Sequence, residues 1–147
     1  MIVTIESLLH KHPFFEGIHE WYVEQLARYA AEVDYKPGKY LIREGGEADK
    51  FFLIREGLVE IGVTSADGTF TKIQTVHPWE ILGWSWLLPP HLWHFDARAT
   101  RPVSTIVLDG RYLRAKCEED SELGYAVLKR LTHHLVRRLI ALRREQV

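Results

Sequence analysis

From Asp34 onward the hydrophobic pattern changes from the helical period of about 3.6 residues to the strand period of 2. Short segments rich in β-branched and aromatic residues follow at 51–55, 58–64 and 70–77, with turn residues between them. Asp67-Gly68 is the strongest hairpin signal among these turns. Many short strands with regular turns predict a β-sandwich or β-barrel at the centre of the chain.

Helical patterns flank this β-rich segment on both sides. Residues 2–12 and 19–33 carry apolar side chains at helical spacing and predict two N-terminal helices. After a final strand, Asp109 can cap one helix, and a longer helix is expected from about 121 to 144. We therefore expect a single domain of residues 1–147, with N-terminal helices at 1–33, a β-sandwich or β-barrel at 34–108 and C-terminal helices at 109–147.

The composition is that of an ordinary globular domain with one core, since 147 residues are too few for two domains of normal size. A formal net charge of −1 gives no general attraction to nucleic acid or to an anionic membrane. One cysteine, Cys117, excludes an internal disulfide and fits a reducing compartment. No apolar run approaches the ~20 residues of a membrane span, and the N-terminus has no signal-peptide pattern. We expect a cytoplasmic protein without a membrane segment.

A specific motif occupies residues 37–59, which read PGKYLIREGGEADKFFLIREGLV. This segment resembles the opening of cyclic nucleotide-binding domains, the family of the bacterial catabolite activator and of the protein kinase A regulatory subunit. The matching positions are Pro37, Gly38, Glu44, Gly45, Ala48, Asp49, Ile54, Gly57 and Val59. The resemblance extends from about Phe14 to the end of the chain. It implies a mainly β fold, an eight-stranded jelly-roll barrel with flanking N-terminal helices and a long C-terminal helix.

Residues 82–99 take the place of the family's phosphate-binding cassette, with a short helical turn expected between Gly83 and the diproline at 89–90. In the family, a glutamate after the glycine binds the ribose hydroxyl, and a later arginine, followed by a small residue, pairs with the cyclic phosphate. Here Gly83 is followed by Trp84, while Trp93 and His94 take the positions of the arginine and the small residue. Indoles therefore replace both polar anchors.

This replacement has an energetic consequence for a charged ligand. Moving an unpaired phosphate charge into a closed pocket costs several kcal/mol, and an indole offers one hydrogen-bond donor without a compensating charge. We therefore predict that cyclic AMP and cyclic GMP bind weakly or not at all. Three kinds of group could still compensate the phosphate charge. They are the backbone amides at Gly83 and Ser85, a protonated His94, and Arg98 or Arg101 turned inward.

Four of the five tryptophans lie between residues 79 and 93. They either fill a pocket that relatives fill with ligand, or they form a site for an apolar or aromatic small molecule stacked on an indole. The expected pocket residues are Leu82, Gly83, Trp84, Ser85, Trp86, Trp93, His94 and Phe95. We expect no cofactor and no metal site, because His91 and His94 lack a third ligand on a rigid element.

The last helix carries a leucine stripe and many cations. The stripe consists of Leu128, Leu131, Leu135, Leu139 and Leu142, and in the catabolite activator family the corresponding helix forms the dimer. A helix of ~35 Å is longer than a small barrel needs, so we predict a homodimer through this stripe. Six basic residues on the helix are interpreted as a solvated face, and no direct DNA binding is expected.

No spacing of nucleophile, base or paired carboxylates suggests an enzyme. The sequence predicts a non-catalytic regulatory or ligand-sensing module whose cassette has lost its charged anchors. Two alternatives remain open. One is a genuine cyclic nucleotide sensor that uses backbone amides, and the other is a docking subunit of an enzyme or transcription complex.

Overall fold

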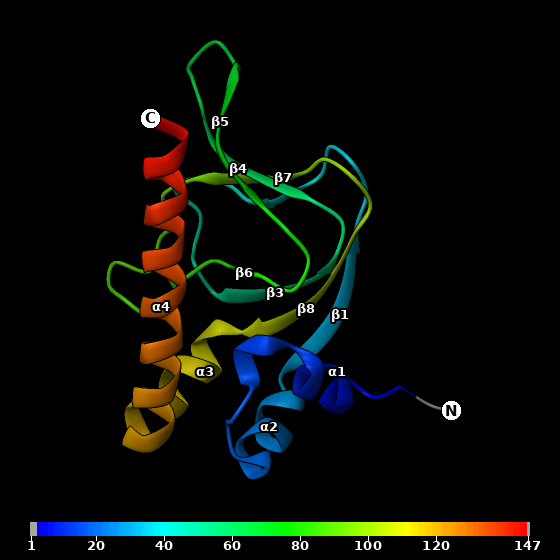
Figure 1. Ribbon diagram of the computed structural model, residues 1–147, viewed down its shortest axis with the longest axis vertical. Helices are drawn as coiled ribbons and strands as arrows, with labels where there is room; N and C mark the ends of the chain where they lie inside the picture. Colours follow the sequence, from blue (N-terminus) through cyan, green and yellow to red (C-terminus); the bar gives the residue numbers. More distant parts are fainter. Residues whose placement is uncertain (1–2, 147) are drawn as a thin grey trace.

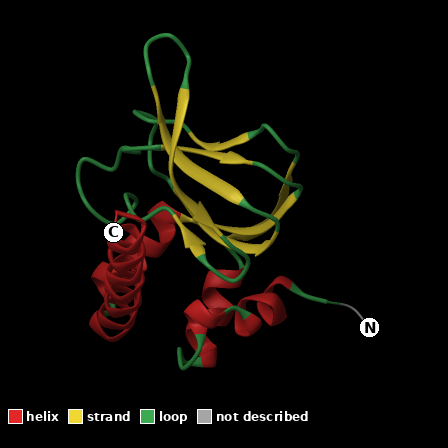
Figure 2. Ribbon diagram, turned by 45° about the horizontal axis from the view of Figure 1, so that its top comes forward, coloured by secondary structure: helices red, strands yellow, loops and turns green. Residues whose placement is uncertain are grey.

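The computed structural model describes residues 3–146 and contains two four-stranded antiparallel sheets packed face to face (Figures 1 and 2). One sheet has the order β1 (Ala30–Tyr35), β8 (Val103–Asp109), β3 (Lys50–Glu56) and β6 (Ile81–Leu82). The other has the order β2 (Tyr40–Ile42), β7 (Asp96–Ala99), β4 (Val59–Thr64) and β5 (Phe70–Val76). These eight strands form the jelly roll that the sequence predicted.

β3 lies at the centre of the fold and separates two hydrophobic cores. Because its side chains alternate, Phe51 and Leu53 pack with the helices, whereas Phe52 and Ile54 pack between the sheets. All four side chains are fully buried. A strand covered on both faces has no polar side, and this is why residues 51–54 form an uninterrupted apolar run.

Gly57 makes the tight turn between β3 and β4 with a φ of 91°. A Cβ at this position would stand 2.9 Å from the Cα of Val103 and even closer to the carbonyl oxygen of Pro102. The turn therefore requires glycine for two reasons, the left-handed backbone and the close approach of the neighbouring strand.

Helices cover one end of the barrel and one of its sides (Figure 2). The elements are α1 (Ile5–Lys11), the 3-10 helix η1 (Pro13–Phe15), α2 (Glu20–Ala27), α3 (Gly110–Glu119) and α4 (Ser121–Gln146). In Figure 1, α4 stands beside the barrel along its height. No helix within residues 3–146 combines the length and the apolar character that crossing a membrane requires.

The predicted second helix at 19–33 is wrong in its second half. α2 ends at Ala27, and residues 30–35 form β1 instead. β1 pairs with β8 along its whole length, from Ala30 opposite Leu108 to Tyr35 opposite Val103. The apolar residues of this segment have helical spacing, but hydrogen bonding to the buried strand β8 stabilises the extended conformation more. The barrel therefore begins at residue 30 rather than at residue 34.

Candidate ligand site

The cassette begins at Gly83, which directly follows β6 and has a φ of 90°. The predicted helical turn is a single hydrogen-bonded turn, in which the Leu87 N–H donates to the Trp84 carbonyl at 3.1 Å, and no helix forms. Further along, the main chain of Trp93 is fixed by the signature segment that precedes β3. Trp93 N–H donates to the Gly46 carbonyl at 2.9 Å, and Gly45 N–H donates to the Trp93 carbonyl at 2.9 Å.

The indole of Trp93 lies directly against the backbone of Gly83. A Cβ at Gly83 would stand 2.8 and 2.9 Å from two carbon atoms of this ring, so only glycine leaves space for it. The Trp93 side chain also packs on Phe52, with ring centroids 6.3 Å apart, and the residue is 8% exposed. The indole therefore occupies the space below the first glycine of the cassette.

The cavity that remains at the cassette has a volume of about 20 Å³. This is room for about one water molecule, whereas pockets for organic ligands usually measure ~300–1,000 Å³. Seven of the eight predicted pocket residues line it, namely Leu82, Gly83, Trp84, Ser85, Trp93, His94 and Phe95. The structure thus brings these residues together around a space that Trp93 already fills.

Trp86 is the predicted pocket residue that lies elsewhere. Its side chain is fully buried in the core shared with the helices, where it packs on Phe51 with ring centroids 5.4 Å apart. Its indole N–H donates to the Gly83 carbonyl at 3.1 Å. The turn at 84–87 rotates Trp86 to the opposite side of the cassette, so it supports Gly83 from outside the pocket.

Asp96 lines the cavity and was missed by the sequence reasoning. Strand alternation places Asp96 on the outer face, yet the residue is 2% exposed. The Glu44 N–H donates to its carboxylate at 2.7 Å, and the Thr64 hydroxyl also donates to it. Burial alone would raise the pKa of this carboxyl, but these hydrogen bonds and the Arg43 guanidinium hold the pKa below its usual value. A carboxylate therefore stays ionised beside the cavity. No local pattern signals this, because the burial depends on the segment around Glu44 folding over β7.

The two arginines that were expected to compensate a phosphate charge by turning inward lie outside the cavity. Arg98 pairs with Glu60 at 3.3 Å, and its guanidinium carbon lies 4.1 Å from the centroid of the Phe70 ring. Arg101 and His94 are exposed, although His94 reaches the cavity rim. Among the described residues that line this space, His94 and Asp96 alone are ionisable.

His91 and His94 do not converge on a third ligand within residues 3–146. The group of potential ligand atoms found there consists of Glu6, His10 and Glu20, whose atoms lie within 4.8 Å of one another at the N-terminal helices. His10 and Glu20 are exposed, as is common for acidic clusters that hold no ion.

Comparison with known proteins agrees with this architecture. Residues 32–120 match the family model of the cyclic nucleotide-binding domain, and the chain belongs to that family. The crystal structure of a putative cyclic nucleotide-binding protein from Geobacter metallireducens is 27% identical, with a TM-score of 0.83 over 95% of this chain and 99% of that one. The family, the jelly roll and the cassette define a regulatory or sensor domain of the cyclic nucleotide-binding type.

Two relatives are longer proteins. The regulatory subunit of a cAMP-independent protein kinase A from Trypanosoma cruzi, bound to guanosine, is 29% identical, with a TM-score of 0.65 over 84% of this chain and 47% of that one. A CRP-like cAMP-activated global transcriptional regulator from Mycobacterium tuberculosis is 23% identical over 90% of this chain. The chain spans 59% of the length of that regulator.

Proposed function

We propose that this domain is a regulatory module whose nucleotide site is occupied by its own Trp93, and that it does not bind cyclic AMP or cyclic GMP in the way usual for its family. The observation that carries the proposal is the indole held against Gly83, with a residual volume of about 20 Å³. A side chain that fills the site contributes the packing that a bound ligand would contribute, without depending on ligand concentration.

Electrostatics supports the same proposal. A cyclic phosphate entering this site would find no guanidinium among the lining residues. Losing a charge-assisted hydrogen bond costs about 1.5–3 kcal/mol. The displacement of the buried Trp93 indole adds a further cost to the binding of a cyclic nucleotide.

A second candidate function is the sensing of an uncharged flat molecule that replaces the Trp93 indole. The trypanosomal relative bound to guanosine supports this candidate, because guanosine is a nucleoside without a phosphate. A flat ring of this kind could stack against Trp84 or Phe95, whose own ring centroids are 6.2 Å apart. Such a ligand must offset the cost of expelling Trp93, so its binding would be coupled to a rearrangement of the cassette.

Isothermal titration calorimetry with cyclic AMP, cyclic GMP and guanosine tests both candidates. We expect no measurable heat with the cyclic nucleotides, and micromolar or tighter binding of either one would contradict the proposal. The double variant W84E/W93R restores both polar anchors and is expected to bind cyclic AMP at least about tenfold more tightly than the native chain. The single variant W84E serves as the matched control, because it lacks the partner for the phosphate. Micromolar binding of guanosine by the native chain would establish the second candidate instead.

We also propose that the domain forms a homodimer through α4. The helix has two apolar faces, and Leu131 of the predicted stripe belongs to the inner one, where it is 2% exposed beside Leu123 and Val127. The outer face follows heptad spacing of three and four residues, which is the spacing of a coiled-coil seam. Its members are Tyr125, Leu128, Thr132, Leu135, Leu139 and Leu142, of which Tyr125, Leu128 and Leu139 are 66%, 51% and 67% exposed.

Sedimentation equilibrium tests the dimer. The variant L128E/L139E places charges on the outer seam and leaves the inner face intact, so it is expected to convert a dimer to a folded monomer. R144E changes charge on the opposite side of the helix and should leave the association unchanged. A native chain that sediments as a monomer at high concentration would contradict this part of the proposal.

A further inference from the structure

A cavity of about 450 Å³ lies between η1, the β5–β6 loop and α4, and it shares no lining residue with the cassette cavity. Its volume falls within the ~300–1,000 Å³ range typical of small-molecule sites. A neighbouring cavity of about 300 Å³ shares Glu80, His134 and Arg137 with it. The room for a ligand that is missing at the cassette is therefore present here.

The two walls of this cavity differ in chemistry. α4 supplies cationic and imidazole side chains, and the opposite wall is mostly apolar and aromatic. The first wall consists of Lys129, Arg130, His133, His134 and Arg137. The second includes Pro13, Phe14, Trp79 and Ile81. A site with one basic wall and one apolar wall suits a flat molecule that carries a negative charge at one end.

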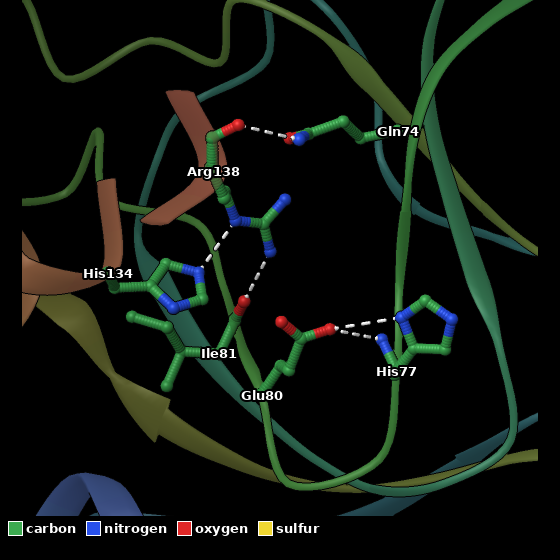
Figure 3. Close-up of polar contacts among 6 residues, drawn as sticks. All are labelled: Gln74, His77, Glu80, Ile81, His134 and Arg138. Carbon is green, nitrogen blue, oxygen red and sulfur yellow. Dashed lines mark hydrogen bonds and ion pairs between the residues drawn. The ribbon is translucent and has the colours of Figure 1, made fainter. Parts of the chain in front are cut away.

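The α4 wall carries three cations, Lys129, Arg130 and Arg137, whereas the lining also includes two carboxylates, Glu16 and Glu80, so a formal excess of one positive charge remains. The Glu80 carboxylate is engaged by His77, whose main-chain N–H donates to it at 2.6 Å and whose ring nitrogen lies 3.3 Å away (Figure 3). Within the described part of the chain, neither Lys129 nor Arg137 forms an ion pair. Lys129 and Arg137 are therefore not held by a carboxylate of residues 3–146 and can turn to an anion in the cavity, while Glu16 and Glu80 reduce the net attraction.

A further guanidinium is fixed at the edge of this region. In Figure 3 the Arg138 side chain reaches from α4 toward the loop, with its Nε donating to His134 Nε2 at 2.6 Å and its Nη2 donating to the Ile81 carbonyl at 2.8 Å. Burial, followed by the charges of Arg138 and Arg137, lowers the pKa of His134 to about 3. The imidazole therefore stays neutral and acts as an acceptor in a region of positive potential.

Trp79 gives the cavity its aromatic surface. Its backbone has a φ of 70°, which is rare for a residue with a large side chain, and its N–H donates to the Ile54 carbonyl at 2.9 Å. The side chain is 47% exposed and contacts His12, with ring centroids 5.9 Å apart. A strained backbone that presents a large exposed indole at a cavity is a feature found at functional sites.

We propose that this cavity binds a flat aromatic acid, with its anionic group against Lys129 and Arg137 and its ring against Trp79. The site is separate from the cassette and does not depend on the proposed function. A ligand held there would touch both α4 and residues 80–81, which lead directly into the cassette.

Titration calorimetry of the native chain with 2-naphthoate, and with the uncharged 2-naphthamide, tests the proposal. We expect the acid to bind at least about tenfold more tightly than the amide. The variant K129Q/R137Q should lose this preference. The control R143Q/R144Q removes the same number of charges from the same helix beyond the cavity, and it should change the affinity for naphthoate less than about twofold. No heat with naphthoate up to roughly 5 mM, equal binding of acid and amide, or equal effects of the two double variants would overturn the proposal.

A second measurement on the native chain does not depend on the folding of any variant. In a two-dimensional NMR spectrum, naphthoate should shift the indole N–H resonance of Trp79 and leave that of Trp93 in place. A shift confined to Trp93 would assign the binding to the cassette and refute the second site.

Discussion

Replacing Trp93 with alanine should destabilise the domain and enlarge the cavity at the cassette. The indole is 8% exposed and leaves only about 20 Å³ unfilled around it, so the neighbouring groups have little slack with which to close the space. Removing it creates a cavity on the order of 150 Å³ and is expected to cost about 3–5 kcal/mol of unfolding free energy. The main-chain hydrogen bonds of residue 93 with Gly45 and Gly46 remain in the variant.

Urea denaturation followed by circular dichroism measures this loss. With an m-value of about 2 kcal/mol/M, the unfolding midpoint of W93A should fall by about 2 M. W21A is the matched control, because Trp21 is 52% exposed and its truncation should cost less than about 1 kcal/mol.

Added indole should restore part of the lost stability, since it fits the space that the variant opens. A tenfold excess of indole over its dissociation constant contributes about 1.4 kcal/mol and should raise the melting temperature of W93A by roughly 3–6 °C in scanning calorimetry. The native chain should not respond. A loss below about 1 kcal/mol in W93A, or the same indole effect in both proteins, would show that Trp93 does not fill the site.

Three further predictions concern other parts of the molecule. Burial lowers the pKa of His12 to about 4. As the pH falls from 6.5 toward 4, the imidazole therefore binds a proton in the unfolded chain but stays neutral in the folded one. The free energy of unfolding should be at its full value above pH 6.5 and should fall by up to about 3 kcal/mol as the pH drops toward 4. Urea titrations across that pH range should show a smaller fall in unfolding free energy for H12N, whose asparagine keeps an acceptor for the Phe14 N–H. An equal fall in H12N and the native chain would exclude His12 as the source of the pH dependence. Burial, followed by the charges of Glu118 and Asp120, raises the pKa of the Cys117 thiol to about 11, so its reaction with a disulfide reagent at pH 8 should be about 100-fold slower than in urea. In equilibrium unfolding, G57A should lose about 1–3 kcal/mol more unfolding free energy than G38A. Both glycines have φ near 90°, but a Cβ at position 38 meets no atom within 4 Å, whereas one at position 57 meets β8. Equal losses in the two variants would contradict the close approach of β8.

The β-rich segment could be predicted from local signals because its strands are short and each turn has its own residue signature, and the family resemblance narrowed the prediction to a jelly roll. Asp67-Gly68 and the alternation in the neighbouring segments are sufficient to place β4 and β5. β1 could not be placed in this way. Its residues fit a helical period as well as a strand, and the pairing with β8, which lies about 70 positions later in the sequence, decided between the two.

The candidate site was predicted as a set of residues rather than as a geometry. The sequence identified the segment that surrounds the cassette cavity, but the side to which each indole points depends on the turn at 84–87. That turn places Trp84 at the cavity and Trp86 in the opposite core. Asp96 was missed because a distant loop covers it, and loop positions have no periodicity that a sequence pattern can reveal.

The faces of α4 show the same division. The leucine spacing indicates an apolar helix, yet residues three and four positions apart belong to either of two stripes, and Leu131 was placed in the wrong one. The amino-acid sequence by itself predicted a β-rich domain from residue identity and short-range spacing, and its resemblance to the cyclic nucleotide-binding family implied the jelly roll. It also placed indoles at positions 84 and 93 of the cassette. Only the tertiary structure decided that the Trp93 indole packs against Gly83 and leaves about 20 Å³ at the cassette, and that α4, η1 and the β5–β6 loop line a second cavity. The physical reason is that packing between segments far apart in the chain sets which side chains meet.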